Sequence, residues 1–229
     1  MTLAIAVILF SSCQQMTGSG NIVTEKRNTG SFKRIDAGSA VEVELKIGSP
    51  ASVVVEADDN LLPIIETSVR GDELNIHTKG SYNITDGHMK VFVTAPEIRG
   101  VKSSGAANIK VLDVLKSDDR VTFEASGAGN IKAAVEAPKV KADVSGAGDI
   151  DLSGRTKDYK VSASGGGNVK SAELLTENTD ADVSGAGSVH VHASVSLKAE
   201  ASGAGSVYYK GGASVQSNTS GAGSVKKED

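Results

Sequence analysis

Ser145-Gly146-Ala147-Gly148-Asp149-Ile150 is the stretch that decides the fold, because the chain repeats it. Copies of this six-residue motif, with small exchanges, begin at Ser104, Ser126, Ser145, Ser164, Ser184, Ser202 and Ser220. Successive copies start 22, 19, 19, 20, 18 and 18 residues apart. A unit this short cannot bury an apolar face by itself, so the repetition predicts a stack of similar units around a common core.

Apolar and polar residues alternate on both sides of each motif, with the period of two that a half-buried strand shows. Before the motif at Ser145, the apolar set is Val140, Ala142 and Val144. After it, Ile150 and Leu152 continue the pattern. Each repeat therefore reads as a strand, a glycine corner and a second strand.

The second motif position is always glycine, and the fourth position usually is. Glycine permits a positive φ and lets backbones approach where a Cβ would clash. We therefore assign a structural corner role to Gly127, Gly129, Gly146, Gly148, Gly165, Gly167, Gly185, Gly187, Gly203, Gly205, Gly221 and Gly223. The Asn, Asp or Ser at the fifth position is expected to form hydrogen bonds at the turn or a ladder between rungs. Residues 18–22 read as an eighth, detached copy.

These patterns predict an all-β protein in which about seven glycine-cornered rungs stack into a β-solenoid over residues 101–229. Aromatic residues make up only 3% of the chain, so the interior must consist of small and β-branched side chains. Residues 31–100 alternate less regularly and predict four or five further strands. That region is expected either to begin the same solenoid or to cap its first rung with antiparallel strands.

An apolar run from Leu3 to Phe10 ends in Ser11-Ser12-Cys13, and Cys13 is the only cysteine. The run is too short to span a bilayer but suits an export signal. The residues before Cys13 are similar to a bacterial lipobox, in which the cysteine becomes a lipidated N-terminus. We expect residues 1–12 to be a signal peptide, residues 13–30 an anchor and linker, and Cys13 the lipid attachment to the cell envelope, at the outer membrane. The alternative is a buried N-terminal strand with a free thiol.

The net charge and the spacing of the motifs exclude several classes of partner and cofactor. The formal net charge is −4 and no stretch gathers Lys and Arg, so we expect no nucleic-acid partner. The Gly-Ala-Gly corner lacks the third glycine and the helix of a dinucleotide loop. Calcium-binding repeats need a nine-residue period with repeated Asp, whereas only Asp149 is acidic at a corner. We therefore expect no cofactor.

His190 and His192 lie two residues apart on one strand face and could chelate a metal. Equivalent positions on the neighbouring rungs offer no good third ligand, so we expect no metal site. A polysaccharide-active β-helix enzyme would need a carboxylate cluster in a groove. Asp143, Asp149 and Asp151 fall on one rung and keep this alternative open. The other acidic residues are scattered, and we expect no catalytic residue.

The glycine motifs, the stretch Gly18 to Val23, and Phe32-Lys33-Arg34-Ile35 followed by Val41-Glu42-Val43 together resemble the head GIN domain family. Members are exported proteins of Bacteroidetes and related bacteria, described as auto-transporter adhesins. The resemblance covers the chain from about Gly18 onward, implies a right-handed β-helix, and brings no catalytic or ligand residues. Gly38-Ser39-Ala40-Val41 departs from the family's Gly-x-Gly corner and leaves that corner unassigned.

The sequence therefore predicts an envelope-anchored, non-catalytic adhesin that binds a surface glycan or protein through a polar face with Tyr159, Tyr208 and Tyr209. The alternative is an envelope scaffold without a specific ligand. The last rung ends in charged residues, which argues against end-to-end fibres and leaves side-by-side oligomers open.

Overall fold

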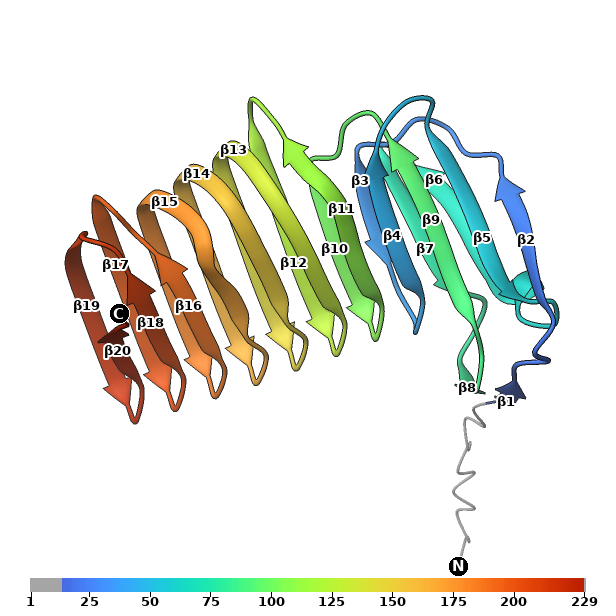
Figure 1. Cartoon of the computed structure of the whole chain (residues 1–229). Helices are drawn as coiled ribbons and strands as arrows, with labels where there is room; N and C mark the ends of the chain where they lie inside the picture. The colour runs from blue at the N-terminus through green and yellow to red at the C-terminus, as the bar shows by residue number, and fades with distance from the viewer. Residues whose placement is uncertain (1–13, 229) are drawn as a thin grey trace, which may run out of the picture.

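A computed structural model describes residues 14–228, and its larger part is a β-solenoid of seven rungs (Figure 1). The strands of the solenoid are β10 (Gly100–Gly105), β11 (Asn108–Lys116), β12 (Arg120–Gly127), β13 (Asn130–Gly146), β14 (Ile150–Gly165), β15 (Val169–Gly185), β16 (Ser188–His192), β17 (Ser196–Gly203), β18 (Ser206–Lys210), β19 (Ser214–Gly221) and β20 (Ser224–Lys227). Neighbouring rungs pair in parallel, one repeat apart, as Ile131 does with Ile150. The expected fold class is confirmed.

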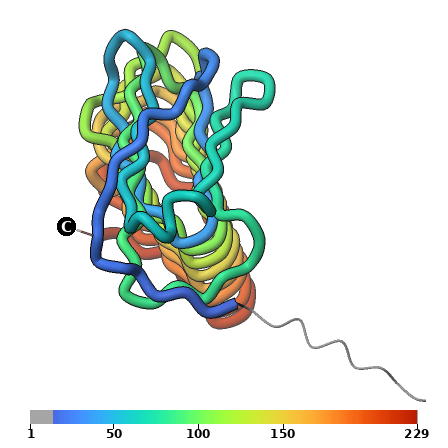
Figure 2. The backbone as a smooth tube through the Cα atoms, turned by 90° about the vertical axis from the view of Figure 1, so that its right-hand side faces the viewer, coloured from blue at the N-terminus to red at the C-terminus, as the bar shows by residue number. Residues whose placement is uncertain are grey.

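Each rung is a flattened coil, and the rungs lie one behind another when the molecule is viewed along the stack (Figure 2). The residues that lead into the glycine corners form the pre-corner face: β10, β12, the second halves of β13, β14 and β15, then β17 and β19. The residues that follow the corners form the post-corner face: β11, the first halves of β13, β14 and β15, then β16, β18 and β20.

The core lies between these two faces and consists mainly of small side chains. Val140, Ala142 and Val144 are buried, as the alternation predicts, and they stand opposite Tyr159, Val161 and Ala163 of the next rung. Stacking turns the short apolar stripe of one rung into a continuous column. Every inner strand also finds its backbone hydrogen-bond partners on the rungs above and below.

Residues 14–95 are less regular and contain nine strands and one turn of 3₁₀ helix. They are β1 (Gln14–Thr17), β2 (Ile22–Arg27), β3 (Arg34–Ala37), β4 (Glu42–Ile47), β5 (Ser52–Asp58), η1 (Leu62–Ile64), β6 (Ile65–Arg70), β7 (Glu73–Thr78), β8 (Tyr82–Thr85) and β9 (Met89–Ala95). This region, which we call the cap, both starts the solenoid and covers its end. β3 and β4 pair in parallel with β10 and β11, while β2, β5 and β6 add antiparallel strands.

The order of the rungs in the cap differs from their order in the sequence. β7 and β9 pair in parallel with β3 and β4 on the side away from β10 and β11. The rung formed by residues 34–47 therefore lies between residues 73–95 and residues 100–116. The corner left unassigned in the sequence joins β3 to β4: Ser39 has a φ of 61°, and its carbonyl accepts a hydrogen bond from the Ala106 N–H at 2.7 Å.

The stretch Gly18 to Ile22, expected to be an eighth corner, is not one. It joins β1 to β2 in a loop that is held by two carboxylates of the cap. Asp58 Oδ1 accepts a hydrogen bond from the Gly20 N–H at 2.7 Å, and Asp59 Oδ1 accepts one from the Ser19 hydroxyl at 2.6 Å. The assignment was wrong because these five residues resemble the motif in sequence, but the strands on either side pair with β8 and β5 and not with a neighbouring rung.

Part of the expected linker, residues 14–27, also forms strands: β1 pairs with β8, and β2 pairs with β5. The expected signal peptide and Cys13 lie outside the described residues. Within residues 14–228, no helix is long and apolar enough to cross a membrane.

Candidate functional site

Most corners hold two glycines, and Gly146 and Gly148 illustrate what each does. Gly146 is exposed and has a φ of 121°, a conformation that side chains disfavour. Gly148 is buried, and a Cβ there would lie 2.0 Å from the carbonyl oxygen of Gly129 on the preceding rung. A Cβ on Gly146 would also lie 2.5 Å from the Gly127 carbonyl oxygen. Both glycines therefore let the rungs approach, and the first also turns the chain.

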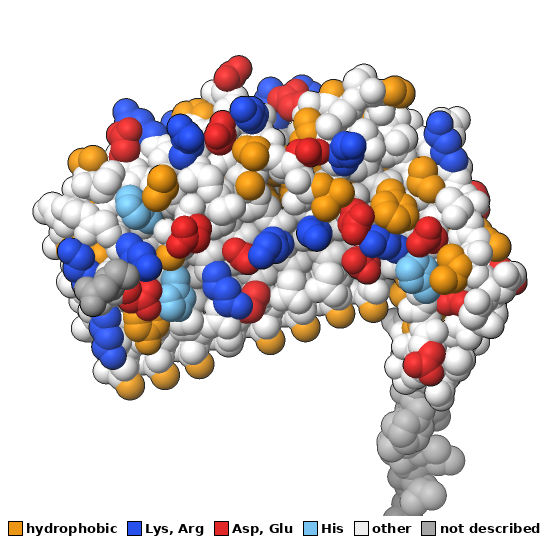
Figure 3. Space-filling model, in the orientation of Figure 1, with side chains coloured by type: hydrophobic (Ala, Val, Ile, Leu, Met, Phe, Trp, Pro, Cys, Tyr) orange, Lys and Arg blue, Asp and Glu red, His pale blue; other side chains and the backbone are white. Residues whose placement is uncertain are grey.

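The middle residue of most corners is an exposed alanine. These residues are Ala106, Ala128, Ala147, Ala186, Ala204 and Ala222. They form a line of small hydrophobic side chains along the lower edge of the molecule (Figure 3). The corner thus supplies tight packing and offers few polar groups of its own.

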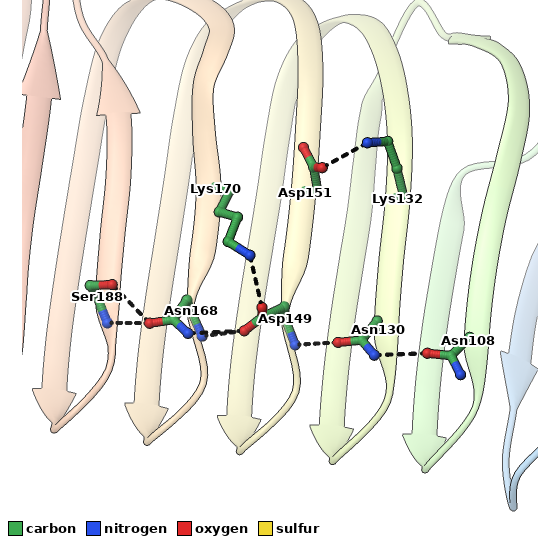
Figure 4. A network of polar contacts seen from close by, with 8 residues as sticks. All are labelled: Asn108, Asn130, Lys132, Asp149, Asp151, Asn168, Lys170 and Ser188. Carbon is green, nitrogen blue, oxygen red and sulfur yellow. Dashed lines mark hydrogen bonds and ion pairs between the residues drawn. The ribbon is translucent and has the colours of Figure 1, made fainter.

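A ladder of polar side chains follows the corners on the post-corner face (Figure 4). Asn130 Nδ2 donates to Asn108 Oδ1 at 2.7 Å, and the Asp149 N–H donates to Asn130 Oδ1 at 3.1 Å. The Asn168 N–H donates to Asp149 Oδ1 at 3.0 Å, and the Ser188 hydroxyl donates to Asn168 Oδ1 at 2.8 Å. The fifth motif position thus forms the ladder between rungs that its polar residues predicted.

Two lysines flank this ladder and pair with carboxylates of neighbouring rungs. Lys170 Nζ lies 3.0 Å from Asp149 Oδ2, and Lys132 Nζ lies 3.0 Å from Asp151 Oδ2. Partial burial would raise the pKa of Asp149, but hydrogen bonds from Lys170 and Asn168 outweigh it and hold that pKa below its usual value. Asp149 is therefore ionised at neutral pH. A shallow groove of about 290 Å³ runs over these residues.

Asp143, Asp149 and Asp151, the basis for considering an enzyme, do not form one cluster. Asp143 precedes its corner and lies on the pre-corner face, whereas Asp149 and Asp151 follow the corner and lie on the post-corner face. The core of the solenoid separates them. Asp143 is also neutralised by Lys141, whose Nζ is 2.6 Å from its Oδ2. The rung brings no acid and base pair together in a common groove.

His190 and His192 share the post-corner face but interact with different partners. The His190 ring stacks on Tyr208, with 4.7 Å between ring centroids, and its Nδ1 is 3.3 Å from Glu228 Oε2. His192 Nδ1 accepts a hydrogen bond from the Thr176 N–H at 3.2 Å. Within residues 14–228, no three His, Cys, Asp or Glu side chains gather as potential metal ligands.

A larger groove of about 620 Å³ crosses the rungs on the pre-corner face. Its cationic side chains are Arg120, Lys139, Lys141, Lys160 and Lys198. They come from different rungs, except that Lys139 and Lys141 share one. Sequence reasoning missed this group because most of its members are about one repeat apart. Aligning the repeats by their glycine corners and reading down equivalent positions would have found it.

The fold and these surfaces define a glycine-cornered β-solenoid with polar outer faces. The chain belongs to the family described as "Putative auto-transporter adhesin, head GIN domain", which matches residues 31–213. No curated protein matches the chain.

Several solved structures share this fold over nearly the whole chain. A putative adhesin from Bacteroides fragilis aligns with a TM-score of 0.87 at 23% identity, over 93% of this chain and 100% of that one. A putative lipid binding protein from Parabacteroides distasonis gives 0.77 at 19% identity, over 94% and 100%. A putative adhesin from the same organism gives 0.75 at 24% identity, over 94% and 100%.

The family and two of these three neighbours are described as adhesins and not as enzymes. These descriptions place the chain among adhesin-like proteins and fit a protein without catalytic activity. Membership of such a family suggests a surface or exported protein.

Proposed function

We propose that the chain is an envelope-anchored adhesin that binds an extended surface polymer, a glycan or a protein, through contacts repeated from rung to rung. The observation that carries this proposal is the register of the outer side chains. Residues one repeat apart stand in line across the rungs, as Asn108, Asn130, Asp149, Asn168 and Ser188 do (Figure 4).

Hydrogen bonds within the ladder support binding because they hold its side chains in place before a ligand arrives. Binding then costs less side-chain conformational entropy. Each rung offers only a few polar contacts, and a single contact of this kind is weak. A rigid stack presents many of them at one spacing to a repetitive ligand, and linked weak contacts raise the apparent affinity.

Lipidation of Cys13 is part of this proposal. The first described strand, β1, begins at Gln14, directly after that cysteine, and pairs with β8 of the cap. A lipid on Cys13 would therefore attach the cap end of the molecule to the membrane without an intervening flexible linker. Cys13→Ala should release the full-length protein from the membrane fraction, and retention of this variant in membranes would refute the anchor.

Lipid binding, which the description of one Parabacteroides neighbour names, has less support in this chain. The grooves described above are shallow surface features lined largely by charged and polar residues. An apolar lipid tail would leave those groups without hydrogen-bond partners. The interior of each rung is filled with side chains such as Leu152 and Val161.

The test is an array of glycans and extracellular-matrix proteins, probed with the soluble chain that begins at residue 14. Positive ligands are then shortened stepwise. We expect affinity to rise with ligand length until the ligand spans the stack of rungs, which is about 30 Å long at the strand spacing. Binding that is independent of ligand length would contradict rung-by-rung contact. A blank array with folded protein would favour the envelope scaffold.

A further inference from the structure

The groove on the pre-corner face is built from two straight rows of outward side chains. The first row is Arg120, Lys139, Asp158, Asn178, Ser196 and Ser214. The second row, two residues further along each strand, includes Lys141, Lys160, Asp180, Lys198 and Gln216. Neighbours within a row are about 4.8 Å apart and the rows are about 7 Å apart, as strand geometry requires.

The two rows together carry a net positive charge, although the formal net charge of the chain is −4. The two rows hold five basic and two acidic side chains. Arg120 and Lys139 form no ion pair with another residue of the described chain. Lys160 pairs with Asp180, with 3.5 Å between Nζ and Oδ2, which is longer than the ion pairs of Lys141 and Lys198. These cations can therefore accept an anionic ligand without breaking strong pairs.

Carboxylates of a third row border the groove on the side of the glycine corners. This row includes Glu124, Asp143, Asp182 and Glu200. Two of these residues orient lysines of the groove: Lys141 pairs with Asp143 at 2.6 Å, and Lys198 pairs with Glu200 at 2.9 Å. The row also repels an anion that shifts toward the corners, so it fixes the lateral position of a bound chain.

We propose that this groove binds an acidic polysaccharide in which charged and neutral sugars alternate. The inference rests on the proposed adhesin function and names its ligand class and site. Taken alone, the two rows carry about one net positive charge for every two rungs, or about 10 Å. The ion pairs of Lys141 and Lys198 with the third row make the free charge sparser still. Double-stranded DNA carries one negative charge per about 1.7 Å, which is far denser. A sparsely charged glycan matches the groove and a nucleic acid does not.

The far half of the groove is suited to neutral sugars. Asn178 Nδ2 donates to Asp158 Oδ1 at 3.0 Å, and the Ser196 hydroxyl donates to Asn178 Oδ1 at 2.8 Å. Ser214 and Gln216 add uncharged polar groups on the last rung, next to Ser196 and Lys198. Sugar hydroxyls can both donate to and accept from such groups. The aliphatic parts of the lysine side chains offer contact to the apolar faces of the sugar rings.

The experiment measures binding of the soluble chain from residue 14 to four polymers: hyaluronan, in which charged and neutral sugars alternate, fully charged polygalacturonate, neutral dextran and duplex DNA. We expect hyaluronan to bind best and its affinity to fall as salt is added. The double variant R120A/K139A should bind hyaluronan about tenfold more weakly. The matched control K26A/K46A removes the same charge from two exposed lysines of the cap and should bind like the unaltered chain.

Each contrary result overturns the inference in a different way. Equal hyaluronan binding by both double variants would move the site out of the groove. Stronger binding to DNA, or to dextran with no effect of salt, would refute the ligand class. In either case, binding elsewhere on the array would leave the adhesin proposal intact, whereas failure to bind any array ligand would count against both. Circular dichroism of the variants confirms that they are folded.

Discussion

The solenoid and the cap solve the same problem, the pairing of strands around a buried core, in opposite ways. In residues 100–227, each strand pairs in parallel with its equivalent one repeat away. In residues 14–95, parallel and antiparallel pairs are mixed, and residues 73–95 lie outside residues 34–47. In the solenoid, the repeat identifies the pairing partner of each strand. The cap contains no such repeat, so its strand partners cannot be read from the sequence.

The interiors of the two regions differ in the same way. The cap buries large side chains such as Phe32, Ile35 and Leu74, together with the carboxylate of Asp58, which is 1% exposed. The solenoid buries mostly Ala and Val, with fewer large residues such as Phe123 and Leu152, and closes each corner with glycine. Its stability therefore depends on close backbone approach, while that of the cap depends on individual side chains and their hydrogen bonds.

The largest expected effect concerns the corner. Gly148→Ala places a Cβ 2.0 Å from the Gly129 carbonyl oxygen, and the rungs must separate to admit it. We expect the free energy of unfolding in urea to fall by about 3 kcal/mol or more. Gly166→Ala is the matched control, since its Cβ would meet nothing within 4 Å. That change should be neutral or stabilise by up to about 1 kcal/mol. Equal stability of the two variants would disprove the packing role of Gly148.

The next effect tests the cap. Asp58 accepts hydrogen bonds from the N–H groups of Gly20 and His88, both at 2.7 Å. Asp58→Ala leaves these donors without their partner, which should destabilise the cap by about 2 kcal/mol. Hydrogen exchange should accelerate in residues 18–22 and leave the solenoid unchanged. Asp118→Ala, which removes an exposed carboxylate, is the control. Equal acceleration in cap and solenoid would show that the two regions open together.

A smaller effect compares two polar groups inside the solenoid. The Thr179 hydroxyl donates to the His192 carbonyl at 2.8 Å, so Thr179→Val should destabilise by about 1 kcal/mol. Tyr159, which we expected on the polar binding face, lies instead in the core and is 2% exposed. Its hydroxyl has no hydrogen-bond partner among the described residues, and the Ser171 hydroxyl donates to the His190 carbonyl at 2.7 Å. Tyr159→Phe should therefore leave stability unchanged or raise it in the same urea titration. A large loss of unfolding free energy in Tyr159→Phe would show that the Tyr159 hydroxyl does have a hydrogen-bond partner.

The smallest effect is the pH dependence of the ladder. Because the pKa of Asp149 is lowered in the folded state, its charge stabilises the protein above the unfolded pKa of about 4. That contribution is lost as the pH falls through the folded pKa. Asp149→Asn should cost less than about 1 kcal/mol at pH 7, and the difference from the unaltered chain should shrink below pH 4. A difference that grows on acidification would contradict the assigned direction.

Much of the solenoid was predictable because its signals are local and repeated. The alternation around Ser145 identified Val140, Ala142 and Val144 as core residues, and they are buried. The cap was harder because its pairings join segments far apart in the sequence. Ser39 illustrates what the sequence could not predict. A positive φ is uncommon for serine. The corner was therefore recognised only in the structure, where the Ala106 N–H of the next rung donates to the Ser39 carbonyl.

The sequence by itself determined that this protein is a stack of glycine-cornered rungs, because the motif specifies a turn, a close approach and two alternating strands within each short repeat. Only the tertiary structure decided which outer side chains meet. Arg120 and Lys139 are 19 residues apart in the chain and directly paired in the sheet. The physical reason is that register between rungs converts distance along the chain into a step of about 4.8 Å. Charges that are scattered in sequence thereby become a surface.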